Sequence, residues 1–176
     1  MRLATMLRGI NVSGHRKVSM KELLAVCADL GYRDAESYVQ SGNLVFDPGK
    51  ASAKTVATEL EKAIESAFGY PDVDVLLRTG NQLSALVKGN PYLADGADPK
   101  TLHVTVLKTK PKKPLSDDGS WRPDGFTVDG LDVYVSCPNG YGRTKLNNSF
   151  FESKLGVRAT TRNWRTICTL AEMTAG

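Results

Sequence analysis

The sequence is poor in several residue types that common protein functions require. It has only two histidines and three cysteines among 176 residues, and these are too scattered to form the ligand cluster of a zinc site. The nucleotide-binding patterns GxGxxG and GxxxxGK[ST] are both absent, so no nucleotide loop is predicted. We therefore expect neither a metal nor a cofactor.

Long apolar runs are also missing. No stretch approaches the roughly 20 apolar residues that cross a bilayer, and the N-terminal apolar stretch is interrupted too soon for a signal peptide. The cysteines, Cys27, Cys137 and Cys168, form no CxxC pair, and an odd number of cysteines favours a reducing compartment. The sequence thus predicts a soluble, cytoplasmic protein without a membrane partner.

Positive charge is mild in total but unevenly distributed. The chain has 23 Lys and Arg against 19 Asp and Glu, a net charge of +4. The segment from Tyr141 to Arg165 alone carries six basic residues against the single acid Glu152, a net charge of +5. A solvated face that is balanced by acids elsewhere is the plainer interpretation, and an anionic partner is the alternative.

Hydrophobic periodicity predicts a ferredoxin-like unit in the first half. A capping box of Ser19 and Glu22 starts one helix, and Ser41-Gly42-Asn43 has the composition of a tight turn between strands. The expected elements are a strand over 2–7, a helix from Ser19 to Gly31, strands over 36–40 and 44–46, a helix over 56–67 and a strand over 73–77. Their order is β-α-β-β-α-β.

The pattern recurs in the second half, after a short helix that a capping box of Thr79 and Gln82 opens. We expect strands over 102–108, 126–128, 131–135 and 157–160, a helix over 146–155 and a C-terminal helix from about Asn163. The predicted fold is α+β: two ferredoxin-like (βαββαβ) subdomains with mainly antiparallel sheets, helices on one face and a final helix. The predicted domains are residues 1–90 and 101–176, joined by a linker at 91–100.

Two polar loops are predicted to meet at one edge of the first sheet. In a split β-α-β unit the first two strands run parallel, so the loops that follow them leave the same edge. Glycines permit close approach, and amides, basic side chains and the Ser19 helix start favour an anion. The predicted ligand-binding residues here are Arg8, Gly9, Asn11, Arg16, Lys17, Gln40, Ser41, Gly42 and Asn43. The plainer interpretation is that the glycines only form turns and the asparagines bond the backbone.

An enzymatic alternative depends on Cys137 and Arg143, which have the C-x5-R spacing of cysteine phosphatases. In such enzymes a thiolate attacks phosphorus while backbone N–H groups and the arginine hold the oxygens. Asp124 is a candidate general acid. Two features oppose this interpretation: Pro138 lacks the N–H that the cradle needs, and strand alternation turns Cys137 toward the core. We therefore assign no catalytic residue.

Several stretches resemble an uncharacterised bacterial family, the domain of unknown function 1697. They are LRGINVSGHRKVSMKEL, SYVQSGNLVF, CPNGYGRTKLNNSFFESKLGV and TTRNWRTI, and they extend from Leu7 to Ile167. The resemblance implies an α+β fold of ferredoxin-like subdomains. It implies no activity, substrate or catalytic residue, and it does not include Cys137 among the fixed positions.

The favoured prediction is a binding protein for an anionic partner, either nucleic acid or a phosphorylated small molecule. In the basic segment, phosphates would contact arginines and bases would stack on an aromatic ring. The candidate residues are Tyr141, Arg143, Lys145, Arg162 and Arg165. Trp164 could also stack, although its helical stripe favours the core. A protein–protein interaction module is the third alternative, because sheet edges can pair with other chains.

Overall fold

The protein is an α+β chain that forms two compact units, described here in a computed structural model of residues 1–176. The first unit comprises Met1–Leu83 and Leu170–Gly176, and the second comprises Ser84–Thr169. Each unit has its own four-stranded sheet. None of the helices is both long and apolar enough to cross a membrane.

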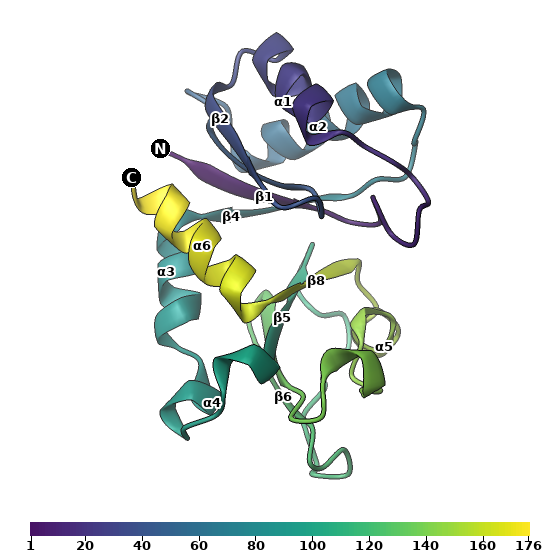
Figure 1. Ribbon diagram of the computed structural model, residues 1–176, viewed down its shortest axis with the longest axis vertical. Helices are drawn as coiled ribbons and strands as arrows, with labels where there is room; N and C mark the ends of the chain where they lie inside the picture. The colour runs from purple at the N-terminus through teal and green to yellow at the C-terminus, as the bar shows by residue number, and fades with distance from the viewer. The chain divides into compact units, whose positions relative to one another are not determined.

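The first unit is a split β-α-β sheet with two helices on one face (Figure 1). Its elements are β1 (Leu3–Leu7), α1 (Met20–Asp29), β2 (Arg33–Tyr38), β3 (Asn43–Asp47), α2 (Ala53–Phe68) and β4 (Val75–Thr79). The strand order is β2-β3-β1-β4, with every neighbouring pair antiparallel. Because β1 and β2 are both antiparallel to β3, they run parallel to each other, as the sequence predicts.

Local signals in the sequence explain where the helices of this unit begin and end. The Ser19 hydroxyl accepts the N–H of Glu22, and the Ser52 hydroxyl accepts the N–H of Thr55, so each caps a helix that would otherwise leave donors unpaired. Gly69 ends α2 in the left-handed conformation. The stripes of α1 and α2 bury Leu23, Cys27, Val56, Leu60 and Ile64 against one face of the sheet.

The second unit repeats the sheet without a counterpart of α1. Its elements are α4 (Pro91–Ala94), η1 (Pro99–Thr101), β5 (Leu102–Leu107), β6 (Gly125–Asp129), β7 (Asp132–Ser136), η2 (Tyr141–Arg143), α5 (Asn148–Leu155) and β8 (Ala159–Asn163). The strand order, β6-β7-β5-β8, matches that of the first sheet position by position. Two further helices, α3 (Gly80–Lys88) and α6 (Trp164–Ala175), each contain residues of both units.

Strand registers show that β1, β3 and β4 correspond residue by residue to β5, β7 and β8, whereas β2 has a register shift between Arg33 and Glu36 that β6 lacks. Ala4 pairs with Arg78 in the first sheet as Val104 pairs with Arg162 in the second. Thr5 and Thr105 are therefore equivalent, and both are fully buried. The junction from β4 to α3 also matches that from β8 to α6. At each of them a side-chain oxygen, of Thr79 or of Asn163, accepts the N–H of the residue three positions ahead. The predicted recurrence of the fold is confirmed.

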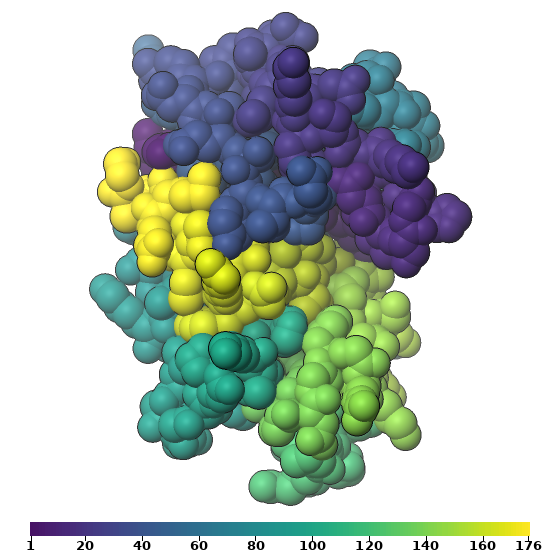
Figure 2. Space-filling model, in the orientation of Figure 1, coloured from purple at the N-terminus to yellow at the C-terminus, as the bar shows by residue number.

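The two units differ mainly in the connection between the first two strands. The first unit has α1 there, whereas residues 108–124 of the second unit contain no helix. Prolines at 111, 114 and 123 and a run of lysines leave no apolar stripe that a helix could bury. Leu115 and Trp121 pack against the core instead. Figure 2 shows part of this connection, in green, on the surface.

Several predicted boundaries differ from those observed. The strand predicted over 73–77 is β4, Val75–Thr79, and the strand predicted over 157–160 is β8, Ala159–Asn163. Residues 91–100, predicted as a linker, contain α4 and the start of η1. The two compact units also differ from the predicted domains 1–90 and 101–176, because α3 and α6 continue across the boundary between them.

Gly42 offers a test of how tightly β1 and β3 are joined. Its φ is +80°, and a Cβ atom there would lie 2.7 Å from Ile10 Cδ1 and 2.9 Å from Leu7 Cβ. We predict that Gly42→Ala lowers the free energy of unfolding by about 2–4 kcal/mol, since it adds both backbone strain and overpacking. Urea denaturation measures the change.

Gly14→Ala is the matched control. Gly14 has a similar φ of +77°, but no atom lies within 4 Å of the added methyl group. This variant should lose only about 1 kcal/mol, because it adds strain alone. Equal losses in both variants would show that Ile10 and Leu7 do not restrict position 42.

Candidate functional site

The two predicted loops of the first unit do meet at one edge of the sheet. The N–H of Leu7 donates to the carbonyl of Gly42 at 2.9 Å, and Met6 and Tyr38 both pair with Asn43. The topological premise of the predicted site is therefore correct. Gly9, exposed, and Gly42, buried, both have positive φ values.

The asparagine amides between these loops bond the protein itself. Asn11 Nδ2 donates to the carbonyls of Val18 and Gln40, at 3.0 and 2.6 Å, and Asn11 Oδ1 accepts the N–H of Val18 at 2.8 Å. Asn43 is fully buried, and its Nδ2 donates to Tyr38 and Ser41. These contacts hold the loops together and leave little capacity for a ligand.

The basic side chains of these loops also have partners within the first unit. Arg16 forms an ion pair with Asp72 at 2.6 Å, and Arg8 lies 4.0 Å from Asp74. Lys17 and Gln40 are exposed. Since neighbouring aspartates offset the two arginines, the positive charge predicted at this edge is largely balanced.

We predict that Asn11→Ala destabilises the protein by about 2–3 kcal/mol, because it removes three hydrogen bonds and leaves backbone groups without their partner. Ser13→Ala is the control: Ser13 has a similar φ of 49° and is exposed. The control should change the free energy of unfolding by less than 1 kcal/mol. A loss in Asn11→Ala no larger than that in Ser13→Ala would contradict the assigned role.

The basic segment of the second unit is dispersed by the fold. Arg162 is only 8% exposed, and its guanidinium donates to Thr160 Oγ1 at 2.6 Å and to the Thr161 carbonyl at 3.0 Å. Burial lowers the pKa of Arg162 to about 10. Arg165 is exposed on α6, and Trp164 is 5% exposed, as its helical stripe predicts.

The aromatic candidate Tyr141 has a structural role. Its ring stacks on His103, with 4.5 Å between the centroids, and its hydroxyl accepts the N–H of Asn148 at 3.0 Å. Burial of His103 lowers the pKa of its imidazole, so this ring is neutral at pH 7. Tyr141 therefore presents less of its face than a stacking residue would need.

Arg143 and Lys145 are exposed and line one hollow together. This Arg143 hollow has a volume of about 420 Å³ and is lined by Ser120–Asp124, Asn139, Gly140, Arg143 and Lys145. Arg122 adds a third cation, which the sequence did not single out as a site residue. The one acid, Asp124, accepts the Thr144 hydroxyl at 2.6 Å. The hollow is thus basic, with an indole in its lining.

Cys137 lies next to this hollow in the sequence but is fully buried. Burial raises the pKa of its thiol, and the nearby Asp124 charge raises it further, while a hydrogen bond with Thr144 acts in the opposite direction. The N–H of Gly140 donates to the Cys137 carbonyl at 2.9 Å and closes a turn. A cysteine phosphatase needs an exposed thiolate that faces a phosphate cradle. The Cys137 thiol is instead buried and has a raised pKa.

We predict that iodoacetamide at pH 8 modifies native Cys137 at least 100-fold more slowly than the same cysteine in urea, because a raised pKa leaves little thiolate and burial blocks access. Cys27, whose pKa burial raises to about 12, should behave alike. Half-buried Cys168 is the internal comparison. Mass spectrometry of the peptides measures the rates, and fast modification of native Cys137 would revive the phosphatase hypothesis.

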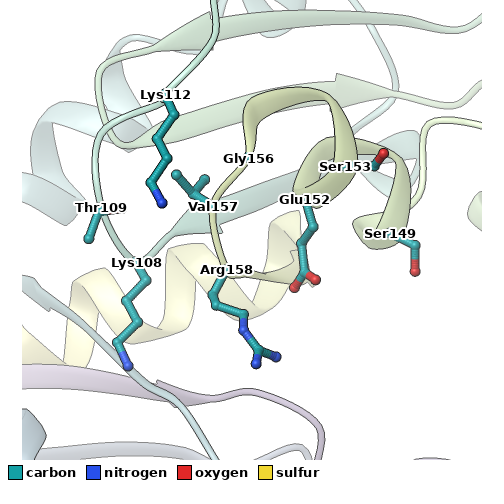
Figure 3. Close-up of a pocket in the computed structure, with 9 residues that line it drawn as sticks. All are labelled: Lys108, Thr109, Lys112, Ser149, Glu152, Ser153, Gly156, Val157 and Arg158. Atoms are coloured by element: carbon teal, nitrogen blue, oxygen red, sulfur yellow. The ribbon is translucent and has the colours of Figure 1, made fainter.

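A second basic hollow lies in the same unit (Figure 3). This Lys112 hollow has a volume of about 590 Å³ and is lined by Lys108, Thr109, Lys112, Ser149, Glu152, Ser153, Gly156, Val157 and Arg158. The sequence indicated only that residues 108–114 are an exposed, basic loop. It did not show that this loop lies beside Arg158, which comes from the turn between α5 and β8.

Charge is separated between the two units. The first unit has 10 Lys and Arg against 11 Asp and Glu, a net charge of −1, whereas the second has 13 against 8, a net charge of +5. Both basic hollows belong to the second unit. The fold and these hollows define an α+β protein of two ferredoxin-like units, one of them strongly basic.

Comparisons with known proteins agree with this architecture. The chain belongs to the family described as "Protein of unknown function (DUF1697)", whose model matches residues 1–134. It is similar to the solved structure of the conserved bacterial protein SP0830 from Streptococcus pneumoniae, with 21% identity, a TM-score of 0.77 and 98% of each chain covered. At this identity the likeness concerns the fold. No curated protein matches the sequence.

Proposed function

We propose that the protein binds an anionic partner through its second unit, and that the Arg143 hollow takes the phosphate group of a small molecule. The observation that carries this proposal is the meeting of Arg122, Arg143 and Lys145 around one concave surface. Their acid neighbour Asp124 already accepts a hydroxyl donor. A phosphate there would gain charge-assisted hydrogen bonds, and the two arginines can each bind it with two N–H groups.

The rest of the hollow suits a ligand with a polar body larger than phosphate. Trp121 contributes an indole, which packs edge-on against Phe150 with 4.9 Å between the centroids. Ser120 and Asn139 add hydroxyl and amide groups. Small-molecule sites commonly combine such a volume with an aromatic wall and a few polar groups. A phosphorylated metabolite fits this combination better than inorganic phosphate does.

The loops of the first unit support the proposal less well. Their asparagines bond the backbone, their arginines face aspartates, and their unit has a net charge of −1. We therefore assign Arg8, Arg16, Asn11 and Asn43 to the stability of the sheet edge. Among the residues that the sequence singled out, Arg143 and Lys145 form the core of the proposed site.

A panel of sugar phosphates, nucleoside monophosphates and other phosphorylated metabolites tests the proposal by thermal melting. We predict that at least one compound raises the melting temperature by several degrees, because a ligand at 100 times its Kd adds about 2.7 kcal/mol of stability. The double variant Arg143→Gln/Lys145→Gln should lose most of that rise.

The control variant, Lys50→Gln/Lys54→Gln, removes two exposed charges from the first unit and should keep the full rise. The unphosphorylated form of the compound should have no effect on either protein. A panel without any effect would overturn the proposal and favour the protein–protein interaction module instead. An equal loss in both double variants would show a nonspecific effect of net charge.

A further inference from the structure

The Lys112 hollow belongs to a larger basic surface in the second unit. The connection between β5 and β6 supplies four lysines, at 108, 110, 112 and 113, and Arg158 lies beside them. Three of the four lysines are exposed, Lys108 is half-buried, and Arg158 is exposed. We define these five residues as the lysine strap. Glu152 is the one acid that lines the hollow.

We propose that the lysine strap binds the phosphate backbone of nucleic acid without reading its sequence. This inference is independent of the proposed phosphate site in the Arg143 hollow, since no residue lines both hollows. It assigns a second ligand class, a polyanion, to a different hollow of the same unit.

Backbone hydrogen bonds hold the strap in place. The N–H of Lys108 donates to the carbonyl of Arg158, and the N–H of Lys112 donates to the carbonyl of Leu155, both at 2.9 Å. A Cβ atom at Gly156 would lie 3.5 Å from Lys112 Cβ, so the lysine stem packs closely over the end of α5. Pro111 further restricts the loop. The cations are therefore presented by a fixed backbone, which limits the entropy lost on binding.

Glu152 is engaged in the fold of the unit. Its Oε1 accepts both Asn148 Nδ2, at 3.1 Å, and the N–H of Ala159, at 3.0 Å. These bonds join α5 to β8. The carboxylate thus has a structural reason to be present, and the unit as a whole has a positive excess of 13 Lys and Arg over 8 Asp and Glu, a net charge of +5. Such an excess attracts a polyanion at long range.

The arrangement of the side chains favours a chain of phosphates over a single phosphate. Figure 3 shows the Lys108 and Arg158 side chains extending in the same direction, while the Lys112 amine ends apart from both, so the three cations do not converge on one point. No aromatic residue lines the hollow, and base stacking is therefore absent. Contacts to the backbone alone give binding that is sequence-independent and strongly dependent on salt.

Fluorescence anisotropy with the full chain and a labelled 20-base-pair random-sequence DNA duplex tests the proposal. We expect binding at 25 mM NaCl that weakens steeply toward 200 mM. The triple variant Lys108→Gln/Lys112→Gln/Arg158→Gln should bind at least 10-fold more weakly. Because each neutralised phosphate contributes about 0.9 to the slope of log K against log salt, that slope should fall by nearly three.

The control is Lys50→Gln/Lys54→Gln/Lys62→Gln, which removes three exposed charges from the first unit and should change the affinity less than twofold. If the triple variant does not fold, Lys112→Gln alone should reduce the slope by about one. Arg143→Gln/Lys145→Gln should leave the slope unchanged, which separates this proposal from the small-molecule site.

Three results would overturn the proposal. The first is no duplex binding at 25 mM NaCl, and the second is an equal effect of the strap variant and the control. The third is tight binding of inorganic polyphosphate without binding of DNA or RNA of equal charge, which would assign the strap to a different polyanion.

Discussion

The loops at the sheet edge of the first unit depend on the Asn11 side chain. Its amide bonds both the carbonyl of Gln40 and the backbone of Val18, so one residue joins the loop after β1 to the loop after β2 and to the segment that leads into α1. Gly42 makes this junction possible, because no side chain would fit between Ile10 and Leu7. The polar groups of these loops thus form hydrogen bonds that stabilise the sheet edge.

The second unit uses its polar residues differently. Its sheet is equivalent to the first, but its net charge is +5 instead of −1. Two basic hollows lie on it, one around Arg143 and one around Lys112. In each of them the lining acid already bonds donors of the protein, Asp124 to Thr144 and Glu152 to Asn148. The second unit therefore carries more cations than acids around both hollows.

Local patterns predicted most of the fold but little of the site. Caps such as Ser19 and Thr79 act within three residues, and the stripe of Trp164 depends only on helical spacing, so the sequence reveals them directly. By contrast, the ion pair of Arg16 with Asp72 joins residues 56 positions apart. Arg122 and Arg143 line the same hollow only after the chain has folded. The sequence also did not predict the burial of Arg162, because a basic side chain in a basic segment is expected to be exposed to solvent.

The connection at residues 108–124 shows how far the two halves of the chain differ around one sheet topology. Where the first copy of the unit keeps helix α1, the second has a proline-bearing loop, and residues of that loop line both hollows. One and the same strand order thus accepts either a packed helix or a proline-bearing loop between its first two strands, so this connection can change without altering the sheet.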